Sequence, residues 1–246
     1  MERNVLCVKW GERYTAEHVN RLYKMVKRNM SLPFSFYCLT EDSTDINPEV
    51  NIIDLDLSLD LKKWWWKICL FQDNLVSGDV NLYLDLDVVI QQSIDHMFYD
   101  TPQVGIIDRS YVTNSFFCNR EHDDDFLSSS RTYYNSSILS WRNNSQQHIY
   151  DTFIKDKEWF TYFYRGLDGF LFNEIDPKHF IPINEDDFYF RRSQILMDGT
   201  DPNVRAHLIE NRKDITQHIW FYERPICIIT GDHYETFVKG LEKYFL

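Results

Sequence analysis

The first hundred residues alternate between short apolar runs and segments in which apolar residues recur at helical spacing. The clearest helical pattern spans residues 16–30, where Val19, Leu22 and Val26 share one face, and Pro33 ends it. Strand-like runs cover residues 4–9, 34–40, 51–55 and 82–90, and a second helical pattern covers residues 64–75. This alternation predicts an α/β fold with a mostly parallel sheet, whose ligands bind at the carboxyl ends of the strands.

After residue 100 the segments become shorter. The patterns predict strands at 104–107, 134–141 and 225–230, helices at 145–154, 168–173 and 234–245, and exposed loops at 121–125 and 184–205. No linker, repeat or low-complexity segment divides the chain. We therefore expect a single domain over residues 1–246.

The charge balance limits the classes of partner. The formal net charge of −12 argues against an extended nucleic-acid surface, because such surfaces gather Lys and Arg. Five cysteines occur singly, without a Cys-x-x-Cys pair, which is typical of reduced thiols. No apolar window reaches the ~20 residues of a membrane span. These features predict a cytoplasmic protein without a membrane span.

Two carboxylates, Asp85 and Asp87, interrupt the apolar run LYLDLDVVI at residues 82–90. On a straight strand their side chains point to the same face, where two like charges repel unless a cation lies between them. Carboxylate oxygens suit hard cations such as Mn²⁺ or Mg²⁺. The alternative is that the strand ends at Leu84 and that both carboxylates are solvated in a loop.

YLDLDVVI resembles the Asp-x-Asp strand of nucleotide-sugar-dependent glycosyltransferases of the GT-A fold, a group with many bacterial and phage members. Further motifs agree in order: CVKWG at 7–11, FSFYCLTED at 34–42, WWWKICLF at 64–71 and YNSSILSW at 134–141. The resemblance covers about residues 4–175. It implies one GT-A domain, with a nucleotide-sugar-binding half at residues 1–100 and an acceptor-side half at residues 101–246.

The resemblance implies that Asp85 and Asp87, with Leu86 between them, hold Mn²⁺ or Mg²⁺ against the diphosphate of a nucleoside-diphosphate sugar. A UDP-sugar is the favoured donor. In the family a third metal ligand is a histidine near the last strand, and His233 in ICIITGDH is the corresponding candidate. His207 and His218 are rivals, and a site of two aspartates, phosphate and water is a further alternative.

The remaining donor contacts are also implied by the resemblance. The end of the first strand would face the base and ribose of the donor. Thr40, at the end of the second strand, would also contact the base or ribose, and Lys67 would reach a phosphate. The first-strand candidates are Val8, Lys9, Trp10, Gly11 and Tyr14, with Trp10 or Tyr14 stacking. Trp10 is equally well explained as a packed aromatic, and Lys67 as a solvated helix lysine.

The resemblance places the reaction chemistry in the second half of the chain. Asn135 and Ser136 would face the donor sugar or a sugar-containing acceptor, with Asn135 and Asp168 as the catalytic candidates. Asp168, in RGLDGFLF, falls where the family has an acidic pair at a helix start, but Gly169 takes the second place here. The resemblance favours transfer of a hexose with retention of configuration.

Two other functions compete with this interpretation. A nucleotide-sugar-binding protein with weak or no catalysis would keep the same fold, and the departures at Gly169 and near His233 favour it. A sugar nucleotidyltransferase also combines an α/β sheet with a carboxylate-bound metal. It ranks lower because residues 4–16 contain no Gly-rich, basic phosphate loop.

Overall fold

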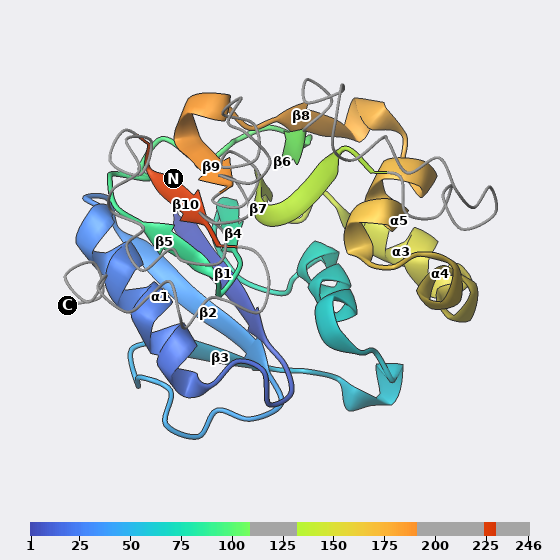
Figure 1. Cartoon of the computed structure of the whole chain (residues 1–246), viewed down its shortest axis with the longest axis horizontal. Coiled ribbons are helices and arrows are strands. Elements are labelled where there is room, and N and C mark those ends of the chain that lie inside the picture. Colours follow the sequence, from blue (N-terminus) through green and yellow to red (C-terminus); the bar gives the residue numbers. More distant parts are fainter. Residues whose placement is uncertain (109–131, 191–223, 230–246) are drawn as a thin grey trace, which may run out of the picture.

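A seven-stranded sheet forms the centre of the computed structural model, which describes residues 1–108, 132–190 and 224–229 (Figure 1). Its strand order is β3-β2-β1-β4-β7-β6-β8. The strands are β1 (Arg3–Lys9), β2 (Phe34–Thr40), β3 (Asn51–Asp54), β4 (Val80–Leu84), β6 (Val104–Asp108), β7 (Tyr134–Arg142) and β8 (Phe180–Pro182). Only β7 runs antiparallel to its neighbours, β4 and β6. The expected α/β class with a mostly parallel sheet is confirmed.

A second, smaller sheet has the order β5-β10-β9. Its strands are β5 (Val88–Ile90), β10 (Ile226–Ile228) and β9 (Phe188–Phe190). β10 is antiparallel to β5 and parallel to β9, so segments that are far apart in the sequence meet in it. Strand β10 therefore joins the last described segment to the residues directly after the Asp85–Asp87 pair.

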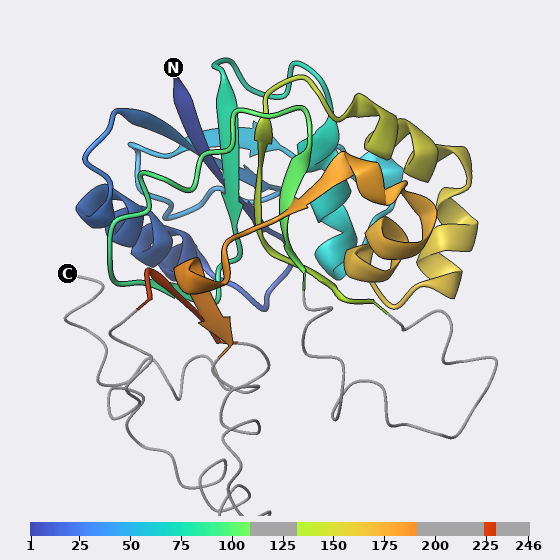
Figure 2. The same cartoon turned by 90° about the horizontal axis from the view of Figure 1, so that it is seen from above.

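The helices pack on both faces of the large sheet (Figures 1 and 2). The α-helices are α1 (Ala16–Asn29), α3 (Gln147–Lys155), α4 (Lys157–Phe163) and α5 (Leu167–Glu174); the 3₁₀-helices are η1 (Leu57–Leu59), η2 (Lys63–Phe71), η4 (Pro177–His179) and η5 (Glu185–Asp187). Helix α1 and the small sheet share one apolar core, while η2, α3, α4 and α5 share the other. Within the described ranges no helix combines the length and apolarity needed to cross a bilayer.

Alternation along β1 divides its side chains between these two cores. Val5 and Cys7 pack with α1, and Leu6 between them packs with η2, as expected when successive strand residues point to opposite faces. Because both faces of the sheet are covered at β1, the sequence of this strand is a nearly continuous apolar run. The four described cysteines, Cys7, Cys38, Cys69 and Cys227, are buried free thiols as expected, and Cys118 lies outside the described residues.

The expected long strand over residues 82–90 is wrong. β4 ends at Leu84, residues 85–87 form a turn, and β5 begins at Val88 in the other sheet. The break is fixed from both sides, because the Asp85 N–H donates to the Ser137 carbonyl (2.9 Å) and the Asp87 carbonyl accepts from the Ile229 N–H (3.0 Å). The premise that both carboxylates lie on one straight strand therefore fails.

Three other expectations need correction. The helix expected at residues 64–75 is the shorter 3₁₀-helix η2, helix α4 was not expected, and strand β9 lies inside the expected loop at 184–205. The expected loop at 121–125 and helix at 234–245 lie outside the described residues.

Candidate active site

The strand order of the large sheet reverses between β1 and β4, which are parallel neighbours. Their carboxyl ends lie side by side, and such reversal points are where open α/β sheets bind ligands. A cleft of about 820 Å³ opens there. Its lining comes from five parts of the chain: Val8 with residues 10–14; Lys63, Trp64 and Lys67; Tyr83 with residues 85–87; Thr132 with residues 135–137; and residues 165–169.

Asp85 and Asp87 lie in the floor of this cleft, on the turn between β4 and β5. The Lys67 ammonium is 2.7 Å from Asp85 Oδ1, and the Tyr83 hydroxyl donates to the same oxygen at 2.5 Å. Asp87 Oδ2 instead accepts from the Tyr14 hydroxyl at 3.1 Å. The two carboxylates are thus held by different partners while both face the cleft.

Three carboxylates, including Asp168, surround the single Lys67 ammonium. Burial and the neighbouring Asp85 raise the pKa of Asp87 to about 7 from an ordinary value of 3.8, against the opposing effect of Lys67. Burial acts to lower the pKa of Lys67, but attraction to Asp85 and Asp168 leaves it above its usual value. Lys67 alone does not balance these three carboxylates, and Arg13, which also lines the cleft, opposes the rise in the pKa of Asp87.

An irregularity in β7 brings the second half of the chain to the floor. The pairing of β6 with β7 jumps from Ile106↔Leu139 to Ile107↔Asn135, and such bulges redirect side chains at sites. Ser136 N–H donates to Asp168 Oδ1 (3.0 Å) at the start of α5. Burial raises the pKa of Asp168, an effect that Lys67 and the hydrogen bonds from Ser136 reduce.

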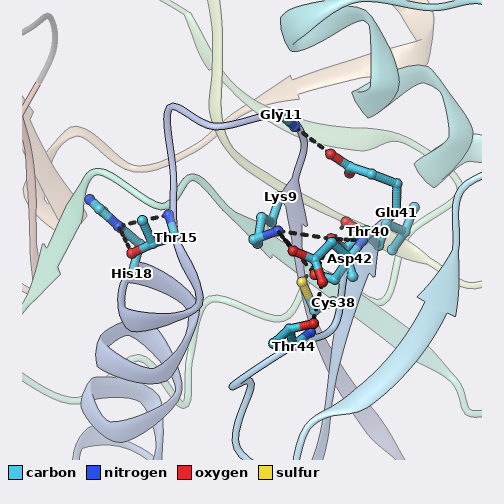
Figure 3. A network of polar contacts seen from close by, with 10 residues as sticks. Lys9, Gly11, Thr15, His18, Cys38, Thr40, Glu41, Asp42 and Thr44 are labelled. Carbon is cyan, nitrogen blue, oxygen red and sulfur yellow. Dashed lines mark hydrogen bonds and ion pairs between the residues drawn. The ribbon is translucent and has the colours of Figure 1, made fainter.

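The loop after β1 forms one side of the cleft. Gly11 has a φ of +66°, which a residue with a Cβ adopts only at a cost, and its N–H donates to Glu41 Oε1 at 2.6 Å (Figure 3). This turn directs the chain from Trp10 toward Tyr14 across the mouth of the cleft. A flat ligand entering from this side would meet both aromatic rings.

Lys9 and Thr40, which were predicted to contact the donor, are not among the residues that line the cleft. Lys9 Nζ donates to the Asp42 carbonyl (3.0 Å) and lies 3.5 Å from Thr40 Oγ1 (Figure 3). Side chains alternate along β1, so Lys9 points to the opposite face of the sheet from Val8 and Trp10. The pair joins the ends of β1 and β2.

The other described candidates meet in the cleft: Val8, Trp10, Gly11, Tyr14, Lys67, Asp85, Leu86, Asp87, Asn135, Ser136 and Asp168. Leu86 is itself buried. His233, with its rivals His207 and His218, lies outside the described residues. The residue roles stay predictions, since proximity alone assigns none.

Sequence reasoning missed Tyr83, Trp64 and Arg165, which also line the cleft. Tyr83 lies two positions before Asp85, so strand alternation could have placed it on the same side. Trp64 and Lys67 are three positions apart in η2, and side chains at this spacing eclipse in a 3₁₀-helix. An α-helix also places residues three apart on one face, so the spacing from Lys67 could have indicated Trp64, whereas nothing in the sequence pointed to Arg165.

The side chains of Asp85 and Asp87 would supply part of the ligand set of a hard divalent cation. Asp85 and Asp87 supply carboxylate oxygens, and because burial and then the neighbouring Asp85 raise the pKa of Asp87, a cation would stabilise its charged form. Among the described residues no cluster of three His, Cys, Asp or Glu side chains is arranged to hold a metal ion. Any further ligands would have to come from substrate, water or the rest of the chain.

Neither a family model nor a curated sequence matches the chain. The fold does resemble solved glycosyltransferases. An active-site mutant of LgtC has a TM-score of 0.66 at 12% identity, covering 98% of this chain and 93% of that one. The galactosyltransferase LgtC in complex with donor and acceptor sugar analogs has a TM-score of 0.61 at 13% identity, covering 93% of this chain and 87% of that one.

A third structure, the bifunctional glycosyltransferase WbbM, gives a TM-score of 0.60 at 11% identity over 96% of this chain and 49% of that one. GlyE from Streptococcus pneumoniae TIGR4 has a TM-score of 0.56 at 13% identity, covering 100% of this chain and 60% of that one. The chain thus spans only part of these two proteins. At such low identity the likeness shows the fold, which is the GT-A-like fold of these glycosyltransferases.

Proposed function

We propose that this protein is a metal-dependent glycosyltransferase, which moves a hexose from a nucleoside-diphosphate sugar to a sugar-containing acceptor. A UDP-sugar is the favoured donor and Mn²⁺ or Mg²⁺ the favoured cation. The observation that carries the proposal is the position of Asp85 and Asp87: they lie in the cleft at the point where the strand order reverses, on a GT-A-like fold.

The excess of carboxylates explains how an acidic protein would take an anionic donor. Asp85 and Asp87 would hold the cation, and Lys67 would stand beside the diphosphate. The chemistry that such a cation supplies is neutralisation of the charge that develops on the leaving diphosphate. Trp10 and Tyr14 would contact the base and ribose from the loop after β1.

The residues around the β7 irregularity would orient the sugar. Asn135 Oδ1 accepts from the Ser137 N–H (3.0 Å), which fixes the side chain at the cleft surface. Asp168 is held by the Ser136 N–H. A carboxylate in this position would accept a hydrogen bond from a sugar hydroxyl and help to hold the donor for transfer with retained configuration.

A second candidate function is nucleotide-sugar binding without efficient transfer. It is favoured by one observation, that Asp85 Oδ1 already engages both Lys67 and Tyr83. A cation would have to compete with these partners for that oxygen. The proposed cytoplasmic location is compatible with either function.

Incubation with UDP-glucose and UDP-galactose, with Mn²⁺ or with EDTA, tests the proposal. Release of UDP over many turnovers, dependent on Mn²⁺ and strongly reduced in Asp87→Ala, is expected, and NMR of the released or transferred sugar gives the anomeric configuration. Metal-dependent UDP binding without turnover on any acceptor tried would favour the binding function. Turnover that persists in EDTA and in Asp87→Ala would contradict the proposed site.

A further inference from the structure

A second group of residues lining the cleft, separate from the loop after β1, is left unused by the proposed donor contacts. It comprises Lys63 and Trp64 at the start of η2 and Arg165 and Gly166 before α5, here called the Trp64 wall. The Asp85–Asp87 turn and Asp168 lie on the cleft floor, and Lys67 belongs to the same helix as Trp64. A ligand on this wall would therefore adjoin the proposed reaction centre.

Trp64 differs from the two tryptophans that follow it. Trp65 and Trp66 are core residues with exposed fractions of 6% and 1%, whereas Trp64 is 41% exposed and lines the cleft. Leaving an indole in contact with water forgoes the stabilisation that burial of such a large apolar surface provides. Its position therefore calls for another explanation than core packing.

Two local features hold the indole in this position. Of the five described non-glycine residues with positive φ, four are Asp or Asn, and the fifth is Lys63 with a φ of 56°. Lysine in this conformation is strained, and such strain gathers at functional sites. On the other side, a Cβ at Gly166 would lie 2.6 Å from Trp64 Nε1, so only glycine lets the indole lie where it does.

Lys63 gives the wall a positive charge although the chain carries a net charge of −12. The Lys63 ammonium is 5.3 Å from the centre of the Trp64 ring. A flat apolar ring beside a cation is complementary to a molecule that has both an apolar face and an anionic group.

We propose that the Trp64 wall is the acceptor subsite, and that the acceptor is an acidic saccharide. The C–H face of a sugar ring stacks on the Trp64 indole, and a carboxylate or phosphate of the same saccharide pairs with Lys63. This inference rests on the proposed function and adds the chemical class of the acceptor and the residues that select it.

Saturation-transfer NMR with Mg²⁺ and UDP tests the subsite, because UDP–Mg²⁺ occupies the proposed donor side and keeps anionic probes off the cation. The probes are methyl β-glucoside, the methyl glycoside of glucuronic acid, and glucose 6-phosphate. The two acidic probes should receive more saturation than the neutral one. A preference for one acidic probe identifies whether carboxylate or phosphate is recognised.

Three substitutions separate stacking from charge. Trp64→Ala should lower the affinity for both acidic probes roughly tenfold, the equivalent of about 1.4 kcal/mol. Trp64→Phe should keep most of the affinity because it retains a flat ring. Lys63→Met should lower the affinity for the acidic probes and leave that for the neutral probe unchanged. Trp159→Ala is the matched control, since Trp159 is 47% exposed on α4 and does not line the cleft.

Each part of the proposal can fail separately. Unchanged probe binding in Trp64→Ala, or saturation of none of the probes by the wild-type protein, overturns the subsite. Equal binding of neutral and acidic probes overturns the acidic class. UDP binding is followed in the same samples, so failure of the donor site is recognised by loss of UDP saturation, independently of the saccharide signals.

Discussion

Replacement of Lys67 by Met should remove the ammonium that pairs with Asp85 and interacts with Asp168. The side chains of Lys67 and Asp85 are 12% and 19% exposed, and their charged atoms are 2.7 Å apart. Removing one partner of a buried ion pair typically costs 3–5 kcal/mol. Because this pair retains some contact with solvent, we expect a loss of about 3 kcal/mol in the free energy of unfolding.

The measurement is urea unfolding in EDTA at pH 8, followed by calorimetric titration of UDP with Mn²⁺. For a chain of this size the expected loss lowers the Tm by roughly 6–12 °C. The Lys67→Met protein should therefore stay folded at low temperature. Its UDP affinity should fall at least roughly tenfold, because the ammonium proposed to lie beside the diphosphate is removed.

Lys9→Met is the matched control for Lys67→Met. The Lys9 side chain is also buried, at 5% exposed, but its ammonium binds the Asp42 carbonyl and does not line the cleft. Its loss should reduce stability and leave UDP affinity within about twofold, less than 0.5 kcal/mol. Equal loss of UDP affinity in the two variants, or none in Lys67→Met, would refute the assignment of these lysines.

Two further substitutions test the charges of the structure. Asp87→Asn should stabilise the protein in EDTA at pH 8 by roughly 1–3 kcal/mol, because burial and Asp85 raise the pKa of Asp87 to about 7; the exposed Asp54→Asn is its control, and a less stable Asp87→Asn protein would contradict the repulsion. His148 packs against His179 with ring centres 4.2 Å apart, and burial followed by His179 lowers the pKa of His148, so stability should be full above pH ~6.5 and fall as the pH decreases below it. His148→Phe should remove this acid-induced loss in Tm, and an unchanged pH profile would exclude the histidine pair as its cause.

The sequence predicted the elements whose signals are local. β1, α1 and β2 agree with their apolar spacing to within one or two residues, because each is covered on a face that its own pattern describes. The break at the Asp85–Asp87 turn could not be predicted in this way. It depends on β5 pairing with β10, a segment far along the chain.

The candidate site shows the same division. The carboxylates and Lys67 were found because they belong to motifs, but Lys9 and Lys67 could not be told apart as structural and cleft-lining lysines from the sequence. The distinction depends on which side of the sheet each chain segment covers. Trp64 was missed because its place in the cleft depends on contact with Gly166, which is about a hundred residues further along the chain.

Asp85 and Asp87 are proposed to bind a divalent cation together with a nucleoside diphosphate. Thermal unfolding of the wild-type protein and of Asp87→Ala, with UDP or GDP and with Mn²⁺ or EDTA, tests it most directly. We expect one nucleotide to raise the Tm of the wild-type protein only with Mn²⁺, because a ligand that binds only the native state raises the Tm. The Asp87→Ala protein should fold but show no such rise. No rise with either nucleotide, or an equal rise in EDTA, would contradict it.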